Sequence, residues 1–137
     1  MEQKKIQLAQ KALSAREMAY APYSQFAVGA AILTADGKIY TGCNIENAAY
    51  SATNCAERTA IFKAVSEGIS DFKMIAVAGG KQGETPQEYC PPCGVCRQVL
   101  AEFCPEDMPV LLVKDKGEFQ EWTLKELLPA AFQKNNL

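Results

Sequence analysis

The chain is organised around the stretch Thr53-Asn54-Cys55-Ala56-Glu57-Arg58-Thr59-Ala60, which places a cysteine, a carboxylate and an arginine within four residues. Because asparagine is a favoured N-cap, the stretch predicts a helix from about Cys55 to Glu67, closed by Gly68. A second stretch further along reads Pro92-Cys93-Gly94-Val95-Cys96-Arg97-Gln98. Together the two stretches can supply three thiolates and a free glutamate to one metal site.

The spacing of Cys93 and Cys96 is suited to metal binding. They lie three residues apart at the expected start of a helix, so both sulfurs face the same side and can bind one ion. A helix N-terminus favours negative charge and keeps such sulfurs as thiolates, and Cys55 has the same position in the earlier helix. Three protein ligands leave a fourth position for water, as in catalytic zinc sites. We therefore expect one Zn²⁺ per chain, bound by Cys55, Cys93 and Cys96.

Two charged residues accompany Cys55. Glu57 need not be a ligand, and beside a zinc-activated water it can carry the proton of that water. Its alternative role is an ordinary carboxylate in the first turn of a helix. Three thiolates around Zn²⁺ leave a net charge of −1, which Arg58 can offset from three positions after Cys55. The alternative for Arg58 is a solvent-facing side chain.

The remaining cysteines leave one alternative open. Cys90 could join Cys55, Cys93 and Cys96 in a closed, four-cysteine structural site. Pro91-Pro92 places Cys90 outside the expected helix, where it can also point away from the metal. Cys43 and Cys104 have no partner at metal spacing, and we interpret them as small buried hydrophobes.

Composition limits the class of protein. The 137 residues are 48% hydrophobic and 22% charged, which is typical of a single globular domain, here residues 1–137. No apolar run approaches the roughly 20 residues of a membrane span, and no signal sequence opens the chain, so we expect a cytoplasmic protein. A pI of about 5.2 and scattered cations disfavour a nucleic-acid partner. The absence of histidine excludes Ser-His-Asp and Cys-His nucleophilic sites.

Hydrophobic periodicity and turn signals predict helices that alternate with strands. Asp36-Gly37 between two apolar runs indicates a hairpin, and the apolar run before it predicts a strand covered on both faces. The pattern favours an α/β fold, a three-layer α-β-α sandwich with a mixed, about five-stranded sheet. The expected helices span about 3–20, 55–67 and 94–103, with a short one after Thr123, and the expected strands span 26–33, 39–43, 72–79, 109–113 and 118–122.

Cys-Ala-Glu-Arg at 55–58 followed by Pro-Cys-Gly-Val-Cys-Arg-Gln at 92–98 resembles the cytidine deaminase family, specifically its small, homotetrameric, three-cysteine branch. The segments 21–31, 42–48 and 127–132 also resemble this branch, so the resemblance runs from about residue 15 to 132. The connector 81–91 departs from the pattern, because it is longer than is common in the family and contains Cys90.

The resemblance implies specific roles for residues of this chain. Cys55, Cys93 and Cys96 would bind zinc, and Glu57 would be the proton shuttle. The other implied site residues are Phe26 against the pyrimidine, Asn44 and Glu46 on the ribose hydroxyls, the backbone of Ala56 against the base, and Ala48, Tyr50 and Phe132 at a neighbouring subunit's site. The active unit would then be a homotetramer with shared active sites. From the residues alone, the two phenylalanines could be ordinary packing groups, and Asn44 and Glu46 ordinary turn residues.

The implied reaction is the zinc-dependent hydrolytic deamination of cytidine and deoxycytidine to uridine and deoxyuridine with release of ammonia, as in pyrimidine salvage. A deaminase for another amino-pyrimidine, such as blasticidin S, would keep the same metal site. Arg58 together with Asn44-Ile45-Glu46 favours the nucleoside. Two further alternatives are a polynucleotide deaminase, which the acidic pI disfavours, and a zinc-stapled module without activity, which would need four sulfur ligands.

Overall fold

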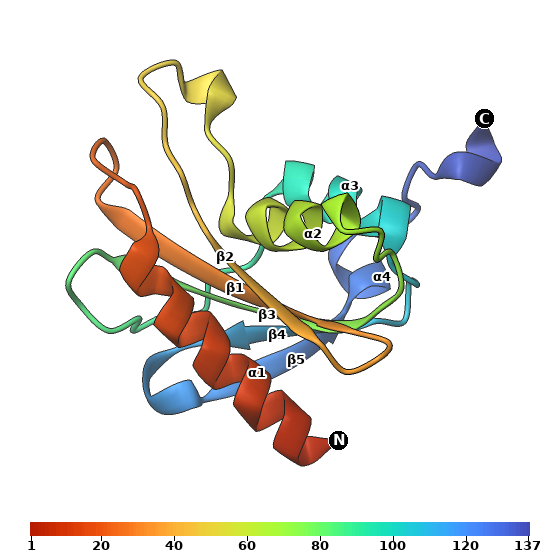
Figure 1. The fold of residues 1–137 in the computed structure, drawn as a ribbon, viewed down its shortest axis with the longest axis horizontal. Coiled ribbons are helices and arrows are strands. Elements are labelled where there is room, and N and C mark those ends of the chain that lie inside the picture. Colours follow the sequence, from red (N-terminus) through yellow and green to blue (C-terminus); the bar gives the residue numbers. More distant parts are fainter.

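The computed structural model describes all residues, 1–137, and contains one mixed sheet of five strands in the order β2-β1-β3-β4-β5. Only β3 and β4 run parallel, and every other neighbouring pair is antiparallel. The sheet and its helices form the three layers that the sequence predicted (Figure 1). The strands are β1 (Phe26–Thr34), β2 (Ile39–Cys43), β3 (Phe72–Lys81), β4 (Pro109–Val113) and β5 (Phe119–Thr123).

Alternate residues of the central strands point to opposite faces, as the pleat requires. Ala30 and Ile32 of β1 belong to one hydrophobic cluster, whereas Ala31 and Leu33 belong to the other. The second cluster is covered by α1 (Glu2–Ala15), and the first by α2 (Ala56–Ser66), α3 (Gly94–Phe103) and the short α4 (Leu124–Leu127). The prediction that β1 is covered on both faces is therefore confirmed. None of these helices is both long and apolar enough to cross a bilayer.

Two predicted helix features were wrong. The first α-helix ends at Ala15 and not near Tyr20, with a single 3₁₀ turn over Arg16–Met18. Tyr20 leaves the helix because its N–H donates to the carbonyl of Asn44 and its carbonyl accepts from Glu46 N–H, both at 2.9 Å. The sequence also predicts that Val95, Val99 and Phe103 share one face of the helix over 94–103, but in α3 only Val99 and Phe103 pack against the core, and Val95 is 57% exposed.

The helix α3 also faces the core with Cys96 and Leu100. Both side chains are buried, and Leu100 belongs to the cluster between the sheet and the helices. The core-facing stripe of α3 therefore includes Cys96 and Leu100 together with the partly buried Val99 and Phe103. We had assigned Cys96 only to the metal, although its buried side chain also belongs to this stripe.

The helix α2 lies directly on β2 at Gly42. A Cβ atom on Gly42 would lie 2.5 Å from the backbone nitrogen of Ala60 and 2.6 Å from the carbonyl oxygen of Ala56. Only glycine allows this close approach of helix and strand backbones. The contact sets the height of the first turn of α2 above the sheet, and with it the positions of Cys55 and Glu57.

Candidate metal and catalytic site

The N-termini of α2 and α3 lie side by side, and each begins at a cysteine. Cys55 is the N-cap of α2 and Cys93 that of α3, since their carbonyls accept the first helical hydrogen bonds from Thr59 and Arg97, both at 3.0 Å. We had predicted Asn54 as the N-cap of α2, which was wrong. Asn54 instead pairs with Ile45 through both backbone groups.

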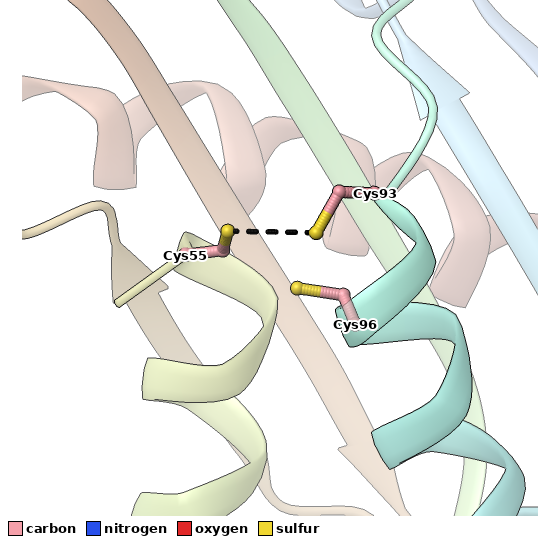
Figure 2. A group of neighbouring side chains, drawn as sticks. All are labelled: Cys55, Cys93 and Cys96. Atoms are coloured by element: carbon pink, nitrogen blue, oxygen red, sulfur yellow. Dashed lines mark hydrogen bonds between the residues drawn. The ribbon is translucent and has the colours of Figure 1, made fainter. Parts of the chain in front are cut away.

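Neither cysteine side chain is used to cap its own helix. Figure 2 shows that the sulfurs of Cys55, Cys93 and Cys96 point towards one another from the two helices. The Sγ atoms of Cys55 and Cys93 are 3.8 Å apart, and all three Sγ atoms lie within 4.8 Å of one another. Zn–S bonds of about 2.3 Å in a tetrahedron place neighbouring sulfurs about 3.8 Å apart. The three sulfurs therefore fit a zinc ion.

The thiols of this cluster are strongly coupled. A hydrogen bond from Cys96 lowers the pKa of the Cys55 thiol to about 5, and the Arg58 guanidinium contributes to the same effect. The contact with Cys55 raises the pKa of Cys96 in turn. Cys55 and Cys96 thus share a proton, which a bound metal ion would replace.

Arg58 lies within reach of the sulfurs, as the sequence predicted. Its Nη2 atom donates to Cys55 Sγ at 3.2 Å. Its Nε atom is buried and has no hydrogen-bond partner within the chain. A buried donor without a partner costs free energy. The attraction between the positive charge of Arg58 and negatively charged cysteine sulfurs would offset this cost.

Glu57 occupies the first turn of α2 and is only 5% exposed. The pKa of its carboxyl is raised to about 7, mainly by burial and also by the charge of Cys55, against the opposing effects of a backbone hydrogen bond and of Arg58. The carboxyl forms no hydrogen bond with another side chain and is free to exchange a proton. Glu57 thus lies in the first turn of α2, as the alternative role requires, but it is buried where an ordinary first-turn carboxylate is usually exposed to solvent.

Cys90 stands outside the cluster. Its sulfur packs on β3, where a Cβ on Gly79 would lie 2.7 Å from Cys90 Sγ and 3.0 Å from the ring of Phe26. The closed, four-cysteine arrangement therefore does not form, because Gly79 provides Cys90 with a place against the sheet. Cys104 is buried as expected, whereas Cys43 is only half-buried.

The other predicted site residues lie mainly on β1, at the start of α2 and in the segment after β2. Phe26 begins β1 and is 41% exposed, and Ala56 is fully buried at the start of α2. The side chain of Asn44 accepts from Val28 N–H at 2.9 Å and donates to the carbonyl of Phe26 at 2.8 Å. This pairing holds the beginning of β1 beside the end of β2.

Glu46 follows in the same segment and binds the turn before β1 through three hydrogen bonds from Tyr23 and Ser24. Ala48, Tyr50 and Phe132 are the three residues predicted to serve a neighbouring subunit. Ala48 is exposed, and the side chains of Tyr50 and Phe132 are 69% and 59% exposed. These three residues are not brought to the sulfur cluster of their own chain.

Residues 2–112 match the family model described as the cytidine and deoxycytidylate deaminase zinc-binding region. The chain belongs to this deaminase family. It is 58% identical over 123 residues to the cytidine deaminase of Sporosarcina psychrophila, covering 90% of this chain and 87% of the relative. The crystal structure of cytidine deaminase from Burkholderia pseudomallei superposes with a TM-score of 0.84 at 45% identity, covering 92% and 97% of the two chains. A blasticidin-S deaminase of Bacillus cereus is 34% identical, covering 79% and 78%.

Membership of this zinc-binding deaminase family agrees with the cluster of three sulfurs.

The hydrogen bonds beside the cluster also identify two residues to which the sequence analysis gave no role. Arg97 follows the last cysteine of the cluster and donates to the carbonyls of Pro92 at 2.7 Å and Leu127 at 2.6 Å. It thereby ties the start of α3 to the end of α4. The neighbouring Gln98 donates to the carbonyl of Phe132 at 2.8 Å. The signal in the sequence that could have identified Arg97 and Gln98 was their position directly after Cys96.

Proposed function

We propose that this protein catalyses the hydrolytic deamination of cytidine and deoxycytidine to uridine and deoxyuridine with release of ammonia. The observation that carries the proposal is a buried carboxylate, Glu57, two residues after a cysteine whose sulfur meets two others at a pair of helix N-termini. The curated relative from Sporosarcina psychrophila is itself named a cytidine deaminase.

Cys55, Cys93 and Cys96 would bind the zinc ion, and Arg58 would offset the negative charge of their thiolates. When bound, Zn²⁺ supplies Lewis-acid activation of water, lowering the pKa of that water from 15.7 to about 7. The field of the two helix N-termini further favours the thiolate forms of the ligands. Three ligands leave room for substrate chemistry, which a four-cysteine site would not.

Glu57 would move the protons of the reaction. Its carboxylate takes a proton from the attacking water and delivers it to N3 of the pyrimidine, which makes C4 electrophilic. The water oxygen bonds to C4, and Glu57 takes the remaining proton from that oxygen and passes it to the exocyclic nitrogen. The C4–N bond then breaks, and the amine leaves as ammonia. Burial of Glu57 away from bulk water keeps this exchange between the carboxyl group and the substrate.

The substrate would lie between the start of β1 and the segment after β2. Phe26 would pack on the pyrimidine, and the backbone of Ala56 would contact the base. Asn44 and Glu46 would hydrogen-bond the ribose hydroxyls. Hydrogen bonds hold Asn44 against β1 and Glu46 against the turn before β1. This supports their role, because side chains that are already held in place bind a ligand at a lower entropic cost.

The active unit would be a homotetramer with shared sites, to which Ala48, Tyr50 and Phe132 contribute across subunits. The large exposed side chains of Tyr50 and Phe132 support this assembly. So do the segment after β2 and the C-terminal residues, which extend away from the body of the domain (Figure 1). A cytoplasmic location is supported by the six cysteines, none of which forms a disulfide, since disulfides are rare in reducing compartments.

The test combines zinc analysis with the ultraviolet spectrum of a cytidine reaction. We expect one zinc per chain, conversion of the cytidine spectrum to that of uridine, and equimolar ammonia. Rates on cytidine, deoxycytidine, deoxycytidine monophosphate and blasticidin S identify the substrate class. Faster turnover of blasticidin S than of cytidine would refute the nucleoside assignment, and light scattering at the mass of a monomer would refute the tetramer.

A further inference from the structure

The turn before β1 holds the carboxylate of Glu46 from two sides. Its Oε1 atom accepts from the N–H groups of Tyr23 at 3.0 Å and Ser24 at 3.1 Å. Its Oε2 atom accepts from the hydroxyl of Ser24. These bonds lower the pKa of the Glu46 carboxyl, with the Ser24 hydroxyl the largest contributor. The carboxylate is thus oriented by residues more than twenty positions earlier in the chain.

The same Ser24 hydroxyl also accepts a hydrogen bond from the N–H of Phe26 at 3.0 Å. A hydroxyl can donate one bond and accept two, so both contacts can form together. One oxygen atom therefore joins Glu46 to Phe26, the residue that begins β1. The positions of these two side chains relative to each other depend on Ser24.

The backbone of this turn is held in a costly conformation. Gln25 has φ = 59°, in the left-handed region that non-glycine residues rarely adopt. Two hydrogen bonds hold it there, from Gln25 N–H to Ala21 at 3.0 Å and from Gln82 N–H to Gln25 at 2.7 Å. Strain of this kind persists only where the surroundings enforce it, and it is concentrated at functional sites. The turn is therefore a fixed support for Glu46.

Ser24 and Glu46 face a hollow of about 310 Å³, which Tyr50 and Thr53 also line. The rings of Tyr23 and Tyr50 meet edge to face at a centroid distance of 6.1 Å. A carboxylate has about four lone-pair positions, and the turn occupies three of them. Glu46 therefore has about one acceptor position left for a ligand in this hollow, which suits one hydroxyl group.

We propose that Ser24 is a positioning residue for sugar recognition, which orients Glu46 towards a single sugar hydroxyl and keeps it in register with Phe26. The proposal rests on the proposed function, because Glu46 and Phe26 are its ribose-binding and base-binding residues. Ser24 acts through Glu46 and need not touch the substrate. Without its hydroxyl, Glu46 keeps two backbone donors but loses the bond that fixes its second oxygen.

The test compares Ser24→Ala with wild type on cytidine and on 2′,3′-dideoxycytidine, which lacks both ring hydroxyls. Ser24 is exposed, so the variant is expected to fold. We expect KM for cytidine to rise about tenfold with kcat changed less than about threefold, the effect of losing one hydrogen bond to a charged group. On dideoxycytidine the variant and wild type should be equal. Ser24→Thr, which keeps the hydroxyl, should restore KM.

A matched control is Ser66→Ala, which removes a hydroxyl bonded to the carbonyl of Lys63 near the end of α2. It should leave KM for both substrates unchanged. Equal losses by Ser24→Ala on cytidine and dideoxycytidine would show a general structural effect and overturn the proposal. So would an unchanged KM for cytidine. A wild-type protein that leaves cytidine intact would instead overturn the proposed function, and the two failures are therefore distinguishable.

Discussion

The contact between α2 and β2 at Gly42 makes a prediction about the metal site. In Gly42→Ala the new methyl group would lie 2.5 Å from the backbone nitrogen of Ala60. Ordinary contacts begin at 3.4 Å, so helix and strand must separate by about 0.9 Å. This nitrogen and the next nearest atom, the carbonyl oxygen of Ala56, both belong to the backbone, so no side-chain rotation relieves the clash. Overpacking of this kind costs about 1–3 kcal/mol of unfolding free energy.

The displacement also reaches the sulfur cluster, because Cys55 is the N-cap of the displaced helix. Its sulfur lies 3.8 Å from that of Cys93, which belongs to a different helix. Zinc–ligand distances tolerate changes of only about 0.2 Å. We therefore expect Gly42→Ala to lower Tm by about 5–10 °C and to weaken zinc binding about tenfold or more.

The assays are thermal unfolding by circular dichroism and zinc competition against a colorimetric chelator. The matched control is Gly94→Ala, since a Cβ at Gly94 meets no atom within 4 Å. That variant should be at least as stable as wild type, because alanine favours the helix more than glycine. If Gly42→Ala melts within a degree of wild type and binds zinc equally well, the argument that this glycine sets the height of α2 is refuted.

Three further predictions concern single side chains. Glu57→Gln should retain stoichiometric zinc but lose about 10²–10⁴-fold or more in kcat, and an active variant would remove Glu57 from the mechanism. Arg58→Gln should bind zinc about 10–100-fold more weakly, measured by chelator competition, and unchanged binding would contradict its role as charge compensator. Burial raises the pKa of the Cys104 thiol to about 12, so the folded state keeps a proton that the unfolded chain releases above about pH 8.5. The contribution of Cys104 to the free energy of unfolding is therefore complete below that pH and falls by up to about 1.4 kcal/mol per pH unit as the pH rises towards 12. In urea unfolding measured against pH, Cys104→Ala should make this decrease less steep. An equally steep decrease in the variant would contradict the role of Cys104.

The sheet was predictable because its signals are local. The apolar run of β1 and the Asp36-Gly37 turn each act within a few residues, and both were found in the structure. The short helix expected after Thr123 also forms, and a local capping box between Thr123 and Glu126 begins it. The errors arose where distant contacts override local preference. The first helix ends early because Tyr20 pairs with Asn44 and Glu46, and nothing near Tyr20 in the sequence announces that pairing.

The N-cap of α2 illustrates the same limit. Asparagine is a strong local candidate, yet the backbone of Asn54 pairs with Ile45, so the N-cap lies one residue later at Cys55 and the helix begins at Ala56. The cap position then orients the Cys55 sulfur away from its own helix and towards α3. A local propensity of about 1 kcal/mol was outweighed by two long-range backbone hydrogen bonds.

The sequence by itself determined which atoms are available to the site. Three thiols at two expected helix starts, one acidic residue and one arginine limit the chemistry, because ligand preference and helix-terminus fields depend on residue type and local spacing. Only the tertiary structure decided which groups meet. It separates Cys90 from the cluster through Gly79, buries Glu57, and joins Ser24 to Glu46. Such contacts depend on how distant segments pack on one sheet, and no pattern of neighbouring residues encodes them.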